Sequence, residues 1–107
     1  MTLYRVVLTE EATDDLMRIE GFIIERELAS ATPDLDVVRH LRDAVDRALR
    51  LLEFSPHSCR RAARALNDAQ RELIVPFGSS GLVAAFEVRG EVVRIGAIRH
   101  QLEQDYH

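Results

Sequence analysis

The side chains best able to carry out chemistry in this sequence lie near its C-terminal end, where Arg99 and His100 are followed by Tyr106 and His107. A histidine and a tyrosine that reach the same phosphate can act as general base and general acid, and an arginine beside them stabilises the charge of the transition state. This combination suits cleavage of RNA. The same residues are also typical of the polar end of a sheet followed by an ordinary tail.

A second group consists of arginines alone. It lies in an expected loop and at the start of the strand that follows, and its members are Arg60, Arg61, Arg64 and Arg71. All 14 basic residues of the chain are arginines, whose planar guanidinium groups bind carboxylates and phosphates, although a genome rich in arginine codons also accounts for this preference. With 18 acidic residues and a net charge of −4, the chain lacks the basic excess of a protein that binds duplex nucleic acid.

Other kinds of catalytic or cofactor site find no support in the spacing of residues. The histidines show no ligand pattern such as HExxH, and a metal site needs three or four converging ligands. The single cysteine, Cys59, rules out an intrachain disulfide and a CxxC zinc site. Arginines close to Cys59 would lower the pKa of its thiol and make it more reactive. A cysteine without a catalytic role accounts for the residue equally well. Residues 78–81 contain glycine but no lysine, so they indicate a hairpin turn rather than a phosphate cradle. We expect neither a metal nor a cofactor.

The length and composition predict one small domain that occupies residues 1–107. The chain is 47% hydrophobic and contains only 5 Gly and 3 Pro, which argues against a disordered chain. No apolar run approaches the roughly 20 residues needed to cross a bilayer. The acidic residues Glu10 and Glu11 come too early for a secretory signal, so we expect a cytoplasmic protein that does not associate with membranes.

The first half of the chain predicts one strand and two helices. Residues 4–8 are β-branched and apolar, as in a strand. Thr9 can cap a helix that runs to about Ala29. The apolar residues of this helix recur on one face, at Ala12, Leu16, Ile19 and Ile23. The run Thr32-Pro33-Asp34 indicates the cap and first residues of a second helix, and Ser55-Pro56 ends that helix.

The second half predicts a loop over residues 57–70, with one helical turn around residues 61–66, and then three strands. The strands occupy residues 73–77, 82–88 and 91–98, and Arg89-Gly90 fits a two-residue hairpin turn. The fold class is therefore α+β with the order β-α-α-β-β-β. A helical hairpin covers one face of a sheet that is antiparallel at least over its last three strands.

This order of elements, together with particular residues, resembles the RelE/ParE toxin family of bacterial type II toxin–antitoxin systems. The similarity extends over nearly the whole chain, and the segments that carry it are VLTEEA at 7–12, Ser55-Pro56, RELIV at 71–75 and VVRI at 92–95 leading to Arg99-His100. The resemblance implies a cytoplasmic protein that inhibits growth and is encoded beside a small antitoxin that wraps around it.

Within that family, the resemblance leaves the chemistry open. RelE-like members are mRNA endonucleases that act on the ribosome, with basic residues on the middle strands and a basic–tyrosine pair near the C-terminus. The strand positions that would be basic are Ile74, Pro76 and Val83 here. Only His100 and Tyr106 match the terminal pair, so one end of a nuclease site is present without the other.

ParE-like members poison DNA gyrase and lack that catalytic set. The opening of the strand at Arg71-Glu72-Leu73 and the helix start at residues 9–12 favour this branch, which implies inhibition by binding. A ParD-like antitoxin is the implied partner. Its acidic or amphipathic segment would meet the arginines if these converge; the candidate binding residues are Arg60, Arg61, Arg64, Arg71 and Arg99. A RelE-like nuclease that acts on ribosome-bound mRNA through Arg99, His100 and Tyr106, and a non-toxic relative that only binds an antitoxin, remain the alternatives.

Overall fold

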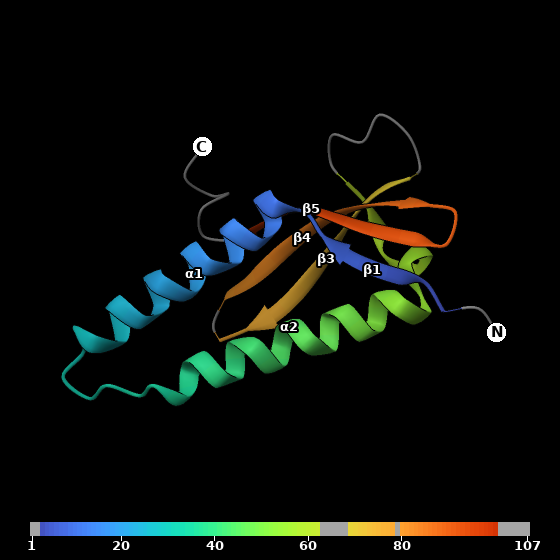
Figure 1. Ribbon diagram of the computed structural model, residues 1–107. Helices are drawn as coiled ribbons and strands as arrows, with labels where there is room; N and C mark the ends of the chain where they lie inside the picture. The colour runs from blue at the N-terminus through green and yellow to red at the C-terminus, as the bar shows by residue number, and fades with distance from the viewer. Residues whose placement is uncertain (1–2, 63–68, 79, 101–107) are drawn as a thin grey trace.

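A computed structural model describes residues 3–62, 69–78 and 80–100 of the chain (Figure 1). The elements in chain order are β1 (Arg5–Leu8), α1 (Glu10–Leu28), α2 (Asp36–Phe54), the short 3-10 helix η1 (Pro56–Ser58), β2 (Arg60–Arg61), β3 (Gln70–Phe77), β4 (Ser80–Arg89) and β5 (Val92–His100). No helix in the described part of the chain is both long enough and apolar enough to cross a membrane.

The strands form one sheet in the order β1-β5-β4-β3-β2. The neighbours β2, β3, β4 and β5 are antiparallel, which confirms the predicted meander of the last three strands. β1 adds to β5 in the parallel direction, with Arg5 opposite Val92 and Leu8 opposite Ile95, so the sheet is mixed rather than antiparallel throughout. The two helices between β1 and the meander provide the long connection that a parallel neighbour needs.

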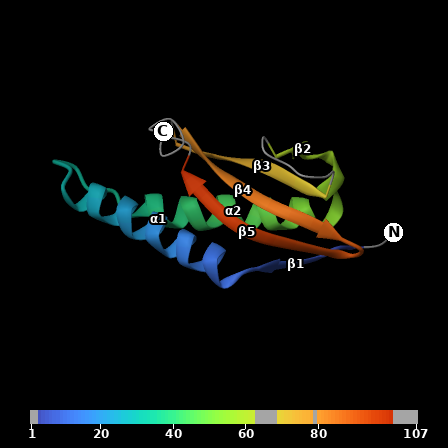
Figure 2. The same ribbon diagram turned by 90° about the horizontal axis from the view of Figure 1, so that it is seen from above.

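Both helices lie on the same side of the sheet, as the view from above shows (Figure 2). Helix α1 packs on β5, and α2 packs on β3. The core lies between these two layers, and its largest fully buried side chains include Ile19, Leu41, Leu52, Leu82 and Ile95. The predicted helical hairpin over one sheet face is therefore present.

The helix boundaries follow from local hydrogen bonds. The Thr9 hydroxyl accepts a hydrogen bond from the Ala12 amide at 3.1 Å and caps α1, as the sequence predicted. The predicted start of the second helix is wrong by a few residues. Helix α2 begins at Asp36, because the Asp34 carboxylate accepts from the Asp36 amide at 3.0 Å while the Asp34 amide donates to Glu27. Residues 32–34 therefore form a bridge between the helices.

The segment predicted as a loop after α2 contains two short elements instead. Pro56–Ser58 forms η1, and Arg60–Arg61 forms β2 with Arg60 opposite Glu72. Arg61 is thus in a strand rather than in the predicted helical turn, and residues 63–66 of that turn lie outside the described part of the chain. The hairpin between β4 and β5 also shifts by one residue. Arg89 pairs with Val92, so the turn is Gly90-Glu91, and Gly90 has a φ of +58° that favours glycine.

We expect the core to depend on Leu52 far more than on its neighbour Leu51. Leu52 is 0% exposed and Leu51 is 46% exposed, so the same substitution tests burial alone. Leu52→Ala should lower the free energy of unfolding by about 2–5 kcal/mol, because it removes buried methyl groups and leaves a cavity. Leu51→Ala should cost less than ~1 kcal/mol. Urea unfolding followed by circular dichroism measures both, and equal losses would contradict this account of the core.

Candidate functional site

The sheet divides the predicted arginines between its two faces. Side chains alternate along a strand, and the helix-covered face holds Leu73 and Val75 of β3. Arg71 therefore belongs to that face, and so does Arg61, which pairs with it in register. Arg60 pairs with Glu72 on the opposite face, where the Arg60 Nε lies 3.3 Å from the Glu72 carboxylate. We call this second face, which no helix covers in the described part of the chain, the open face.

Arg71 has a structural role. Its guanidinium donates to the Cys59 carbonyl at 2.7 Å and to the His57 carbonyl at 3.4 Å, and so ties η1 and the following residue to the start of β3. Its Nε is buried and has no hydrogen-bond partner among the described residues. These contacts turn the Arg71 head group towards the backbone, so it does not present a free cation to an acidic ligand.

Arg99 lies far from the other arginines. It is exposed on the open face and pairs in register with Val83, whereas Arg60 is on β2, on the far side of β4 and β3. Neighbouring strands are separated by about 4.8 Å, so the backbones of Arg60 and Arg99 are about 14 Å apart across the sheet. The arginines that one antitoxin segment would meet if they converged therefore do not form a single cluster. Arg64 lies outside the described residues.

Arg99 and His100, which the nuclease alternative combines, lie on different faces of the sheet. His100 follows Arg99 on β5, so its side chain belongs to the helix-covered face, where it is only 8% exposed. Arg99 and His100 consequently face opposite sides of the sheet. Tyr106 lies outside the described residues, so its place relative to His100 is not defined.

The strand positions that would be basic in a nuclease do come together. Ile74 pairs with Val83, and Val83 pairs with Arg99, so these residues form one row across the open face. Pro76 lies two residues further along β3. The row therefore combines apolar side chains, of which Val83 is buried, with a single arginine, and it has no group that can take a proton from a nucleophile.

The outer edge of β3 has backbone groups that no strand in the described part of the chain pairs with. β2 pairs only with Arg71 and Glu72, so β3 from Leu73 onwards has no neighbouring strand in the described part of the chain on that side. The Ala62 amide donates to the Gln70 carbonyl at 3.0 Å, and every second residue of a strand points its backbone groups the same way. The groups of Ile74 and the carbonyl of Pro76 therefore point outward, and they can pair with an added strand.

A groove accompanies this edge, which we call the edge groove. It holds about 190 Å³ between α2 and β3, and it is lined by Ala44, Arg47, Ala48, Leu51, Leu73, Ile74, Val75 and Pro76. Arg47 is exposed and makes no ion pair within the described residues. The exposed side chains of Arg60 and Arg61 extend the same sheet edge on β2. The edge groove thus combines an apolar lining, free backbone groups and a basic rim. Sequence reasoning did not single out Arg47, because an arginine between the apolar positions of an amphipathic helix is typical of its solvated face.

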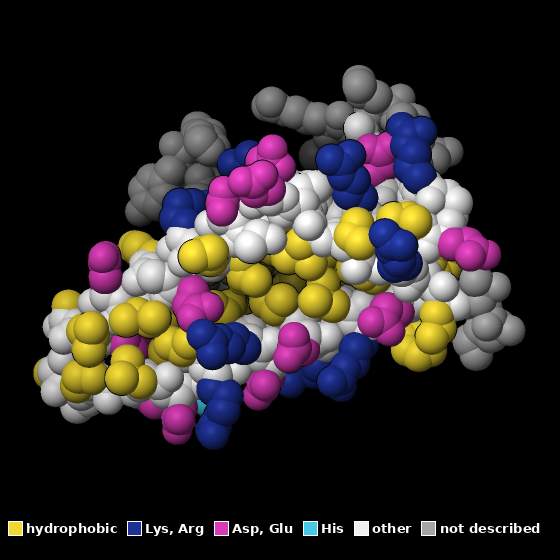
Figure 3. Space-filling model, viewed as in Figure 1, with side chains coloured by type: hydrophobic (Ala, Val, Ile, Leu, Met, Phe, Trp, Pro, Cys, Tyr) yellow, Lys and Arg dark blue, Asp and Glu magenta, His cyan; other side chains and the backbone are white. Residues whose placement is uncertain are grey.

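A second hollow lies between the two helices, where hydrophobic side chains are visible between α1 and α2 (Figure 3). It holds about 190 Å³, and its apolar lining comes from Leu16, Leu41 and Val45. An ion pair crosses it, because Arg42 of α2 lies 2.6 Å from the Glu20 carboxylate of α1. Hydrogen bonding to Glu20 raises the pKa of Arg42. This hollow is therefore bridged by an ion pair, and no ion pair among the described residues bridges the edge groove in the same way.

A larger hollow, about 400 Å³, lies on the open face beside the start of α1. Its floor consists of small residues of β4 and β5, including Ala85, Gly96 and Ala97, and Arg94 lies at its side. Arg94 is exposed and forms no ion pair among the described residues. The β-bulge of the β4–β5 ladder lies in this floor, where Ala85 pairs with Ala97 but Phe86 pairs with Ile95.

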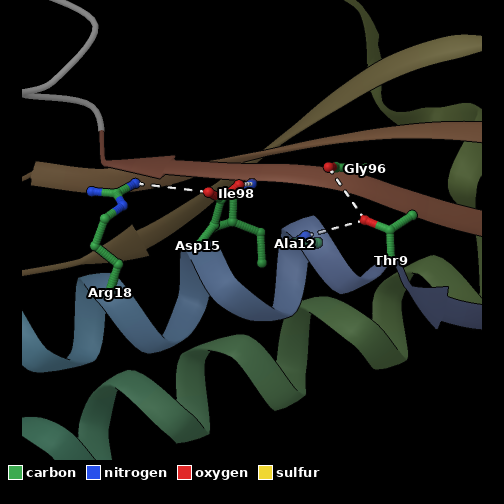
Figure 4. A network of polar contacts seen from close by, with 6 residues as sticks. All are labelled: Thr9, Ala12, Asp15, Arg18, Gly96 and Ile98. Carbon is green, nitrogen blue, oxygen red and sulfur yellow. Dashed lines mark hydrogen bonds and ion pairs between the residues drawn. The ribbon is translucent and has the colours of Figure 1, made fainter.

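A small polar network attaches α1 to β5 at the same place (Figure 4). The Thr9 hydroxyl, besides capping the helix, donates to the Gly96 carbonyl at 3.3 Å. The Asp15 carboxylate accepts from the Ile98 amide at 2.9 Å. Parallel pairing with β1 ends at Ile95, so Asp15 satisfies a donor that the sheet leaves unpaired. Nothing in the sequence indicated this role, since an acidic residue near a helix start is also typical of a favourable interaction with the helix dipole.

Neither thiol chemistry nor metal binding finds support at these places. Cys59 is partly buried, and burial raises the pKa of its thiol more than nearby Arg71 lowers it. The thiol is thus less ionised at neutral pH than an exposed cysteine, which is unfavourable for a nucleophile. No cluster of three or more potential metal ligands occurs among the described residues.

Comparison with known proteins shows which solved structure has a similar fold. A scan against protein-family models found no match, and a search of curated proteins found none either. Among solved structures, the chain is similar to one described as "Chromosomal ParDE TA system from P. aeruginosa", with a TM-score of 0.67 and 18% sequence identity. The match covers 92% of this chain and 96% of that one. The chain therefore has the fold of a RelE/ParE-like toxin, as the sequence resemblance implied.

The attachment of α1 can be tested at Asp15. Asp15→Ala should lower the free energy of unfolding by about 1–3 kcal/mol, because the Ile98 amide then loses its acceptor in a partly buried place. Asp14→Ala is the matched control, since Asp14 is exposed on the same helical turn and makes no ion pair among the described residues. Thermal and urea unfolding of both variants measure the difference in the free energy of unfolding. If Asp15→Ala is as stable as the unaltered chain, the network does not stabilise the attachment of α1.

Proposed function

We propose that this protein is the toxin of a toxin–antitoxin pair, that an antitoxin neutralises it, and that it inhibits growth by binding DNA gyrase. The observation that carries the proposal is the fold, shared over 92% of the chain with a member of a ParDE toxin–antitoxin system. The segments in which the sequence resembles the RelE/ParE family agree with it.

The edge groove is the proposed site for the antitoxin. An extended peptide can add to a sheet edge by pairing with its free backbone groups, and alternate side chains then enter flanking pockets. Ile74 offers a donor and an acceptor, while Pro76 offers only an acceptor because proline has no amide hydrogen. A bound strand would direct apolar side chains towards Leu51 and Leu73, and acidic side chains towards Arg47. The occupant is therefore an extended segment with apolar and acidic residues.

This site can be tested with the product of the adjacent gene as the partner. Ile74→Pro should weaken the complex about tenfold, because it removes one backbone donor worth about 1–1.5 kcal/mol. Ile74→Val retains the donor and should bind nearly as tightly as the unaltered chain. Arg47→Glu should also weaken binding, since it opposes acidic side chains, whereas Arg50→Glu, on the solvated face of the same helix, should not. Isothermal titration calorimetry measures all four, and equal effects of Arg47→Glu and Arg50→Glu would rule out the edge groove.

Inhibition by binding, rather than by catalysis, is the mode that the geometry supports. In the row formed by Ile74, Val83 and Arg99, only Arg99 is charged, and His100 belongs to the other face of the sheet. An exposed arginine there can contact an acidic or phosphate-bearing surface, and none of its register neighbours on the described strands is a general base. A protein that blocks a large enzyme needs surface complementarity and no catalytic group of its own.

A DNA supercoiling assay with purified gyrase tests the target. The chain should inhibit supercoiling in a dose-dependent manner, and a stoichiometric amount of antitoxin should restore it, because the antitoxin covers part of the toxin surface. Arg99→Ala should weaken inhibition if the open face contacts gyrase. If the chain binds the antitoxin normally but does not inhibit supercoiling, gyrase is not its target.

In that event, cleavage of ribosome-bound mRNA is the next activity to measure, with His100→Ala and Tyr106→Phe as the variants. A nuclease should lose at least about a hundredfold in rate with either one. If neither gyrase nor mRNA is affected, the remaining reading is a relative that binds an antitoxin without toxicity.

A further inference from the structure

The sheet has a second edge with unpaired backbone groups, on the outer side of β1. β1 is the last strand on that side, and in the view from above no described helix or strand runs along its outer side (Figure 2). The Arg5 amide donates to the Glu91 carbonyl at 2.8 Å, and alternate residues of a strand point their backbone groups to opposite sides. The amides and carbonyls of Val6 and Leu8 therefore point away from β5. Neither residue has a backbone partner on that side among the described residues.

The strand itself is suited to pairing. Residues 5–8 contain no proline, and their register with β5 is regular, so neither of these common obstacles to strand addition is present. Val6 and Leu8 pack against the core on the helix-covered side, which leaves Arg5 and Val7 on the open face. An added strand would thus meet apolar side chains on both faces of β1.

We propose that β1 pairs with β1 of a second copy in the antiparallel direction, so that two sheets join into one. A two-fold axis at Val7 places Val6 of each copy opposite Leu8 of the other, and each of these pairs exchanges two hydrogen bonds. This register uses the free backbone groups of both residues. A register with Val6 at the axis would instead rely on Tyr4, whose amide already donates to the Glu53 carbonyl at 2.8 Å.

The charges beside the edge select a second copy as the occupant. Arg5 precedes the free groups and Glu11 follows them, and Glu11 lines the hollow on the open face, to which Arg5 also belongs. Both side chains are exposed, and neither makes an ion pair within the described residues. In an antiparallel pair the start of one strand lies beside the end of the other, so Arg5 of each copy comes close to Glu11 of the other. A parallel second copy would place Arg5 beside Arg5, where like charges repel.

The proposed interface is small and separate from the edge groove. It extends along a strand of 4 residues, and the exposed side chains of Leu3 and Phe54 add apolar surface near its start. Such an interface fits a weak dimer, with a dissociation constant on the order of 10–100 µM. The edge groove lies along β3, on the other side of β4 and β5, so a second copy and an antitoxin do not compete for the same edge.

Sedimentation equilibrium of the full chain, made by cell-free synthesis, tests the dimer. Val6→Pro removes an outward amide, which occurs twice in the symmetric interface, and should weaken the dimer at least about tenfold. Proline is tolerated on an edge strand where the amide faces away from the sheet, and circular dichroism checks that the variant folds. Val6→Ala is the matched control, because it shortens the side chain but keeps the amide, and it should stay within about threefold.

A charge exchange tests the choice of a second copy. Arg5→Glu and Glu11→Arg should each weaken the dimer by about tenfold, because two ion pairs are replaced by repulsion, and the double variant R5E/E11R should restore it. Arg50→Glu is the control, since Arg50 is exposed on α2, away from this edge. A chain that stays monomeric up to about 500 µM overturns the proposal. Equal weakening by Val6→Pro and Val6→Ala, or a double variant that does not recover, overturns it as well.

A disulfide across the two-fold axis tests the register. The two copies of Val7 would lie directly opposite each other, with Cα atoms about 4.5 Å apart, within the range of roughly 4.4–6.8 Å that a disulfide spans. In a chain that carries Cys59→Ser, Val7→Cys should therefore form a cross-linked dimer under mild oxidation. Val92→Cys is the control, since Val92 lies on β5 opposite Arg5, and its two copies would be more than about 14 Å apart. Equal cross-linking of both variants contradicts the proposed register.

Discussion

The apolar contact between the helical hairpin and one face of the sheet is the constraint on which the remaining structure depends. Ile19 and Leu41 meet Leu82 and Ile95 there, and all four are nearly or fully inaccessible to solvent. Because side chains alternate along each strand, fixing this face also fixes which residues reach the opposite one. As a result, neighbours in sequence such as Arg99 and His100 lie on opposite faces of the sheet. The separation of the candidate catalytic residues is thus a consequence of core formation.

The ends and edges of the sheet create the second level of organisation. β1 is shorter than β5, and the start of α1 completes the remaining edge through Asp15 and Thr9. At the other edge, β2 covers only two residues of β3, so the backbone at Ile74 stays available. An open edge is a liability for a protein that has no partner, because it can pair with other chains. For a protein that binds a partner strand, the same edge is a binding site.

These features favour a protein that acts by binding other molecules at its surface. The edge groove has backbone groups, apolar side chains and arginines within reach of one extended ligand. On the open face, by contrast, Arg99 lies beside apolar side chains, and Arg94 lies beside small residues around a shallow hollow. Such places suit contact with a larger molecule better than they suit proton transfer.

The sequence by itself determined the elements of this protein and their order, because hydrophobic periodicity, the Thr9 cap and the glycine turns act over a few residues. It also predicted the hairpin over the sheet, since two amphipathic helices and three strands can bury their apolar faces in few other ways. It did not reveal β2, the parallel pairing of β1 or the role of Asp15, because each depends on a partner distant in the chain. The arginines looked like one cluster in sequence, yet strand alternation and strand order separated them. Only the tertiary structure decides which charges meet, because charges interact through space.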